Sequence, residues 1–141
     1  MSTLSLVMIL KDEAHTIERT LLSAKPHVDR WLVLDTGSTD GTQALVRATM
    51  AGLPGELHEG PFVDFAQARN LALRLLGTTR THAVMLDAVD VLVNGEQLRM
   101  CLNLVPASCL SIRQVWEHTE LYVRRIVRTG SGWIYKGRVH E

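Results

Sequence analysis

Short, continuous runs of apolar residues alternate with amphipathic segments along the first hundred residues of the chain. Three apolar runs have the length of a strand that is covered on both faces, namely Leu4–Leu10, Trp31–Leu34 and Ala83–Leu86. Glu56–His58 is a shorter candidate strand between the second and the third run. Together these runs predict a sheet that is buried on both sides.

Segments of helical periodicity separate the predicted strands. They cover Ala14–Ser23, Gly41–Met50, the segment between Asp64 and Gly77, and Asn94–Asn103. Asp64, followed by Gln67 three residues later, is a variant of the capping box that begins many helices. The alternation of strands and helices predicts a parallel sheet with helices on both faces.

The last third of the chain changes character and becomes rich in predicted strands. Leu110–Val115, Glu120–Val127 and Trp133–Val139 are the expected strands, and Gly130–Gly132 is an expected turn. A chain of 141 residues has the length of one domain. We therefore expect residues 1–141 to form a single Rossmann-like α/β domain with a mixed, mostly parallel sheet flanked by helices.

Composition and charge narrow the classes of function. The 15 Lys and Arg residues balance the 15 Asp and Glu residues, whereas a dedicated nucleic-acid binder usually carries a basic excess. No apolar run has the length of a transmembrane helix, and no signal-peptide pattern precedes the first strand. The two cysteines, Cys101 and Cys109, are expected to be reduced and buried. We expect a cytoplasmic protein, with attachment to the inner face of the membrane as a second option.

Polar residues cluster directly after three of the predicted strands. The clusters are Lys11–Glu13, Asp35–Thr42 and Asp87–Asp90. In open α/β sheets, ligands bind outside the carboxyl ends of the strands, where these three clusters are expected to meet. Neighbouring carboxylates favour a divalent cation or a sugar hydroxyl as the ligand. Asp, Gly, Ser and Thr also build ordinary turns and caps, but three such clusters at one edge favour a functional site.

The same segments carry a resemblance to a known family. Val7–Glu13, Leu34–Thr42, Asp64–Asn70, Leu86–Ala88 and Val139–Glu141 resemble, in order and spacing, the motifs of family 2 glycosyltransferases. The resemblance is to the subgroup of lipopolysaccharide-core and peptide S-glycosyltransferases. It implies a glycosyltransferase A fold, a nucleotide-diphosphate-sugar donor, inverting transfer and Mg²⁺ or Mn²⁺ as cofactor. It leaves the acceptor open, as a saccharide, a lipid-linked glycan or a protein.

The resemblance also implies roles for individual residues. Those expected to hold the nucleotide-sugar are Lys11, Asp12, Glu13, Asp35, Ser38, Asp40, Arg69 and Asp87. Within that set, the first three would lie against the nucleoside, and Asp35 would accept a hydrogen bond from the base. Ser38 and Asp40 would shape the base pocket, and Arg69 would approach the diphosphate or brace the acidic strand ends.

The remaining expected roles concern the metal and the chemistry. Asp87, Asp90 and His140 are the candidate metal ligands, and the metal would neutralise the charge that develops on the leaving nucleoside diphosphate. Glu141 is the candidate base that deprotonates the acceptor.

The chain departs from the subgroup's pattern at three points. Val89 stands where the subgroup usually has a second Asp, and Asp90 follows one position later. Asp12 replaces the usual Asn and adds a negative charge. The subgroup's catalytic domain continues beyond the His-Glu pair, so we expect a truncated or donor-binding part. The alternative function is therefore a degenerate module that binds a nucleotide-sugar without transferring the sugar.

Two other classes of protein share features with the sequence. Asp35–Ser38 spells the aspartic-protease signature, but that chemistry needs two facing carboxylates and the chain has one such segment. An assembly role is the other option, because aromatic and aliphatic residues of the tail would form a homodimer surface if they were exposed. These tail residues are Tyr122, Ile126, Trp133, Ile134 and Tyr135.

Overall fold

A mostly parallel sheet runs through the computed structural model, which describes residues 3–77, 82–104, 109–132 and 135–136. The strands are β1 (Leu4–Leu10), β2 (Arg30–Asp35), β3 (Gly55–Glu59), β4 (His82–Met85), β5 (Cys109–Trp116) and β6 (Thr119–Arg128). The helices are α1 (Ile17–Ala24), α2 (Thr42–Thr49), α3 (Phe65–Leu76) and α4 (Gly95–Leu104), with a short 3₁₀ turn at Lys25–His27. The strand order is β3-β2-β1-β4-β6-β5. The first four strands in that order are parallel, and β6 pairs antiparallel with both β4 and β5.

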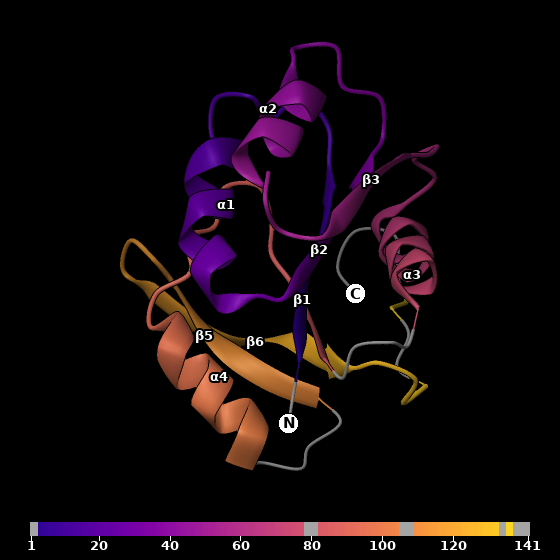
Figure 1. Cartoon of the computed structure of the whole chain (residues 1–141). Helices are drawn as coiled ribbons and strands as arrows, with labels where there is room; N and C mark the ends of the chain where they lie inside the picture. The colour runs from indigo at the N-terminus through magenta and orange to yellow at the C-terminus, as the bar shows by residue number, and fades with distance from the viewer. Residues whose placement is uncertain (1–2, 78–81, 105–108, 133–134, 137–141) are drawn as a thin grey trace.

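Each face of the sheet is covered by its own apolar core. Leu6 and Met8 of β1 point to the face that α1, α2 and α4 cover. Val7 points to the opposite face, where it packs with Ala68 and Ala72 of α3. Figure 1 shows α1 and α2 on one side of the sheet and α3 on the other. This two-sided burial explains why the first strand reads as a continuous apolar run.

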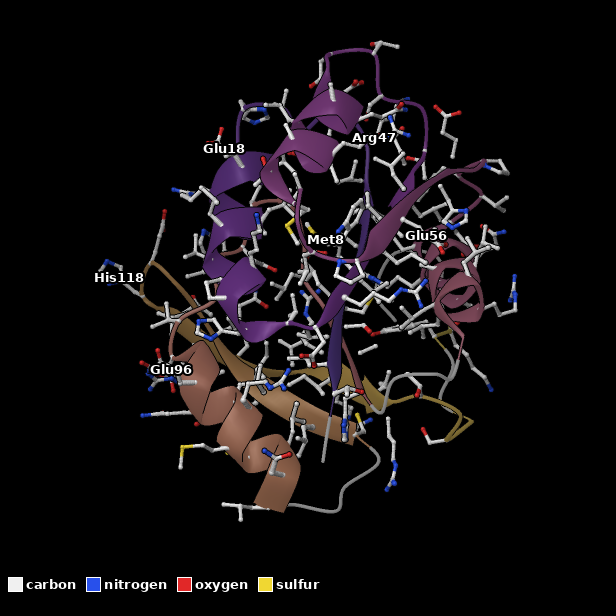
Figure 2. The ribbon with its side chains drawn as sticks, in the orientation of Figure 1. Met8, Glu18, Arg47, Glu56, Glu96 and His118 are labelled. Atoms are coloured by element: carbon white, nitrogen blue, oxygen red, sulfur yellow. The ribbon has the colours of Figure 1, made fainter. Side chains whose placement is uncertain are left out.

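The labelled side chains of Figure 2 show the same division between interior and surface. Met8 lies in the middle of the molecule and is fully buried. Glu18, Arg47, Glu96 and His118 lie at the periphery, and His118 marks the tip of the β5–β6 hairpin. No helix in the described part of the chain is long and apolar enough to cross a membrane.

Several predicted elements begin or end at other residues in the structure. The first helix starts at Ile17 rather than at Ala14, because a turn precedes it in which the Glu13 carbonyl accepts hydrogen bonds from the Thr16 and Ile17 amides. The expected strand Trp133–Val139 lies mostly outside the described residues. The expectation of two buried cysteines is wrong for Cys101, which is exposed on the outer face of α4. Cys109 is half-buried and packs against the core.

The tail residues that would form a dimer surface have different environments. Tyr122 is 72% exposed, whereas Ile126 is 1% exposed and belongs to the core. Tyr135 packs against the core beneath α3. Trp133 and Ile134 lie outside the described residues, so a homodimer through this tail stays a prediction.

Candidate functional site

A cleft of ≈ 730 Å³ opens at the carboxyl edge of the sheet. It lies where the chain order reverses, because β1 has β2 on one side and β4 on the other. Such a topological switch point leaves a crevice between the loops of two adjacent parallel strands, and ligands of open α/β sheets bind there. The residues that line the cleft are Ile9, Leu10, Lys11, Glu13, Thr36, Phe62, Phe65, Arg69, Asp87, Ala88, Val123, Arg124, Arg125 and Tyr135.

Asp35 organises the loop that follows β2. Its Oδ1 atom accepts hydrogen bonds from the backbone N–H groups of Gly37 at 2.9 Å and Ser38 at 2.7 Å. Burial of the carboxylate disfavours its charge, but the hydrogen bonds from Ser38 and Gly37 outweigh burial and lower the pKa of Asp35. Its Oδ2 atom is buried and has no hydrogen-bond partner among the described residues. The role of Asp35 as acceptor for a base stays a prediction, and Oδ2 is the atom with capacity for it.

Side chains of the β2 loop connect it to the loop that follows β1. The Ser38 hydroxyl accepts a hydrogen bond from the Asp12 amide at 2.8 Å, and Asp40 Oδ2 accepts one from Ala14 at 3.1 Å. Asp40 Oδ1 also accepts from the hydroxyl and the amide of Thr42, and the hydroxyl bond lowers the pKa of Asp40. Both loops are therefore held in one fixed arrangement beside the cleft.

Asp12 directs its charge away from the cleft. Its backbone has a φ of +52°, a left-handed conformation that Asn and Asp tolerate better than most residues. Its Oδ1 atom accepts a hydrogen bond from the Thr39 amide at 2.7 Å, and its side chain is not part of the cleft lining. The extra carboxylate at this position therefore holds the two loops together and does not face the cleft.

A carboxylate between two guanidinium groups forms the charged centre of the cleft. Asp87 Oδ1 lies 3.3 Å from Nη2 of Arg69, and Asp87 Oδ2 lies 3.1 Å from Nη2 of Arg125. Arg69 comes from α3 and Arg125 from β6, so the two cations reach Asp87 from different elements. Their side chains are 11% and 14% exposed, and that of Asp87 is 41% exposed.

Aromatic rings fix the position of Arg69. Its guanidinium carbon lies 5.6 Å from the ring centroid of Phe65 and 5.5 Å from that of Tyr135. Asn70 holds Tyr135 in place, since its amide donates to the Tyr135 carbonyl at 2.8 Å and accepts from the Tyr135 N–H at 2.7 Å. Burial raises the pKa of the Tyr135 phenol, which therefore stays neutral beside the two arginines.

The loop after β4 is a tight turn that the side chain of Asp90 closes. Asp90 Oδ2 accepts a hydrogen bond from the Asp87 amide at 2.8 Å, and the Asp90 amide donates to the Asp87 carbonyl at 3.0 Å. Burial raises the pKa of Asp90, and Val89 between the two acids is an exposed aliphatic residue. Among the described residues, no three His, Cys, Asp or Glu side chains gather in a way that would hold a metal ion. The donor set of this turn therefore fits a divalent cation poorly.

The sequence-predicted site residues separate into three groups in the structure. Lys11, Glu13, Arg69 and Asp87 line the cleft. Five others are not lining residues: Asp35 lies at the end of β2, and Asp12, Ser38, Asp40 and Asp90 lie in the loops around the cleft. His140 and Glu141 lie outside the described residues, so their roles as metal ligand and base stay predictions.

Sequence reasoning missed Arg125 and Tyr135 as members of the site. In the sequence, Tyr135 stands among the aromatic residues of the tail, and Arg125 belongs to none of the motifs. The available signal for Arg125 was its position in a predicted strand of alternating pattern, but the partner of that strand could not be read from the sequence.

Known proteins resemble this chain in sequence and in structure. No protein-family profile matches the chain. A TPR repeat-containing protein from Synechococcus elongatus is 41% identical over 120 residues, which cover 85% of this chain and 28% of that protein. The chain thus spans less than a third of this relative. The described residues form a sheet with helices on both faces rather than stacked helix pairs.

Solved structures of glycosyltransferases share the fold of this chain. S. aureus TarS (residues 1–349) matches with a TM-score of 0.63 and 18% identity, over 90% of this chain and 47% of that one. The mannosyltransferase PcManGT from Pyrobaculum calidifontis, in complex with GDP-Man and Mn²⁺, matches with a TM-score of 0.62 and 24% identity, over 77% and 33%. Glucosyl-3-phosphoglycerate synthase from Mycobacterium tuberculosis, in complex with Mn²⁺, UDP and glucosyl-3-phosphoglycerate, matches with a TM-score of 0.51 and 27% identity, over 62% and 33%.

These matches identify the class of fold. The chain has a mixed α/β fold of the glycosyltransferase A type, and the matching structures of this fold hold GDP-Man in PcManGT and UDP in the synthase. The chain spans about half of the TarS fragment and a third of the other two proteins. The activity, donor and acceptor of this protein are therefore matters of proposal.

Proposed function

We propose that the chain is the donor-binding domain of a glycosyltransferase and that a nucleotide-diphosphate-sugar binds in its cleft. The observation that carries this proposal is the cationic cleft at the switch point of a glycosyltransferase A fold. Four cations line the cleft against two carboxylates, which suits a ligand of net negative charge such as a diphosphate. The cleft also has the volume of an ordinary small-molecule site.

The proposed orientation of the donor follows from the chemistry of the residues that different elements contribute to the cleft. The nucleoside lies toward the fixed loops after β1 and β2, where Lys11 and Glu13 line the cleft. Asp35 at the end of β2 has a buried oxygen, Oδ2, without a hydrogen-bond partner among the described residues. The diphosphate lies toward Arg69 and Arg125, whose guanidinium groups match phosphate oxygens. The resemblance to family 2 supports the same orientation.

The reaction that we propose is transfer of the sugar to an acceptor with inversion. The acceptor's nucleophilic atom forms a bond to the anomeric carbon, and the bond from that carbon to the β-phosphate oxygen breaks. The electron pair of the broken bond stays on the phosphate, so the nucleoside diphosphate leaves. The acceptor's proton goes to a base, and the resemblance implies Glu141 for this role. The resemblance implies assistance by Mg²⁺ or Mn²⁺, which the donor set of the turn after β4 fits poorly. We propose that the reaction takes place in the cytoplasm, within the synthesis of a glycan.

The test measures the thermal unfolding of the protein with UDP, GDP, CDP or dTDP, each in the presence of Mn²⁺ or of EDTA. A ligand at about one hundred times its Kd should add roughly 2.7 kcal/mol to the free energy of unfolding. We expect one nucleotide to shift the melting temperature clearly more than the others.

A matched pair of variants on β6 ties the shift to the cleft. Val123 lines the cleft, whereas Leu121, two residues earlier on the same strand, is exposed and outside it. We expect Val123→Trp to abolish the shift by filling the cleft and Leu121→Trp to leave it unchanged. Absence of a shift with every nucleotide in the parent protein would overturn the proposal. A shift without release of nucleoside diphosphate from any sugar donor would favour the non-catalytic binding module.

A further inference from the structure

The loop after β4 presents few free side-chain oxygens to a divalent cation. Both oxygens of Asp87 are paired with arginines, at 3.3 Å and 3.1 Å. Asp90 turns its carboxylate inward to the Asp87 amide, and the side chain of Val89 has no ligand atom. A divalent cation bound to Asp87 would lie beside two guanidinium groups, and such like charges repel strongly in a partly buried site.

The two arginines, by contrast, are arranged as a preformed anion site. Arg69 is held by two aromatic rings and Arg125 by its place in the sheet, where neighbouring Ile126 pairs with Val84 of β4. Neither side chain exposes more than 14% of its surface, so little rotamer entropy remains to be lost on binding. A planar guanidinium donates two parallel hydrogen bonds to a phosphate, which a point charge does not do.

From this arrangement we propose that Arg69 and Arg125 together bind the diphosphate of the donor and replace a divalent cation in neutralising it. The inference rests on the proposed function, since it assumes a nucleoside diphosphate in the cleft. Asp87 keeps the two guanidinium groups close together in the absence of ligand. When the bond between the anomeric carbon and the β-phosphate oxygen breaks, the pair of arginines stabilises the charge that the phosphate gains.

The first experiment compares nucleotide affinity with and without a divalent cation. The nucleoside diphosphate that gives the largest thermal shift is titrated by calorimetry in Mn²⁺ and in EDTA. We expect the two Kd values to agree within about threefold, because the arginines already supply the neutralising charge. A loss of binding in EDTA would overturn this inference while leaving the proposed function intact. No binding in either buffer would overturn the proposed function itself.

The second experiment uses variants of β6 in EDTA. We expect Arg125→Gln to raise the Kd of the nucleoside diphosphate by about tenfold or more. The Kd of the matching monophosphate should rise by much less. Arg125→Lys retains the charge beside Asp87 but not the fork, so its affinity should lie between those of the parent and the Gln variant. Arg128→Gln, three residues further along β6 at an exposed position outside the cleft lining, is the matched control.

Two results of the variant series would overturn the inference. Circular dichroism and urea unfolding establish that each variant is folded before its Kd is interpreted. Equal affinity of the parent and Arg125→Gln for the diphosphate would overturn the inference even if binding in EDTA is strong. An equal loss for diphosphate and monophosphate would do so too, because a structural defect of the cleft would weaken both.

Discussion

At the scale of single residues, Asp35 links the shape of the β2 loop to pH. Its pKa is lowered in the folded protein from an ordinary value of 3.8, so between the folded and the ordinary value only the unfolded chain binds the proton. Its stabilising contribution is therefore complete above the ordinary value and is lost as the pH falls through the folded value. We expect the free energy of unfolding of the parent to fall more steeply below pH 3.8 than that of Asp35→Asn.

The measurement is urea unfolding of both proteins across the acid range, with the difference between them taken at each pH. At neutral pH, Asp35→Ala should be less stable than the parent by about 1–3 kcal/mol, because two backbone N–H groups lose their acceptor. Asp35→Asn keeps an acceptor oxygen and should lose less. Parallel pH curves for the parent and Asp35→Asn would show that this carboxylate does not couple loop structure to pH.

At the scale of one element, α3 depends on a local cap that also supports the site. Asp64 Oδ1 accepts a hydrogen bond from the Gln67 amide at 2.8 Å at the start of the helix that carries Arg69. Asp64→Ala should lower the free energy of unfolding by about 1 kcal/mol, and Asp64→Asn by only a few tenths. Urea unfolding monitored by circular dichroism measures both. Equal stability of the Ala and Asn variants would mean that the cap contributes nothing.

The helix α3 and the strand β6 show how far sequence reasoning reaches. The limits of α3 could be predicted because their signals are local: Asp64 with Gln67 begins the helix, and Gly77, at a φ of +76°, ends it. The apolar run of β1 could be predicted for the same reason. The position of β6 between β4 and β5 is a long-range pairing, which no local pattern specifies. Because Arg125 reaches Asp87 only through that pairing, its place in the site could not be predicted.

The polar loops at the sheet edge were predictable as a group but not in their individual contacts. The rule that ligands bind at the carboxyl ends of parallel strands was enough to bring the clusters after β1, β2 and β4 together. It did not show that Asp90 turns inward to cap the Asp87 amide, because that contact depends on the tight turn at Ala88 and Val89. Asp90, one of the three expected metal ligands, closes this loop with its carboxylate, and its role as a ligand stays a prediction.

At the scale of the whole molecule, a chain of zero net charge concentrates cations at one place. Lys11, Arg69, Arg124 and Arg125 line the cleft, opposed by Glu13 and Asp87. The core that holds the fold together is apolar on both faces of the sheet. Salt should therefore weaken nucleotide binding more than it changes the free energy of unfolding, because screening weakens a charged ligand site and has little effect on apolar packing.

We expect the Kd of the best nucleoside diphosphate to rise by about tenfold between 0.1 M and 1 M NaCl, as the screening length falls from about 10 Å to about 3 Å. The free energy of unfolding of the ligand-free protein, measured in urea at both salt concentrations, should change little. Arg125→Gln should flatten the dependence of the Kd on salt, because one of the cations that attract the diphosphate is gone. A Kd that is insensitive to salt in the parent protein would show that shape and base contacts, rather than the cations of the cleft, hold the nucleotide.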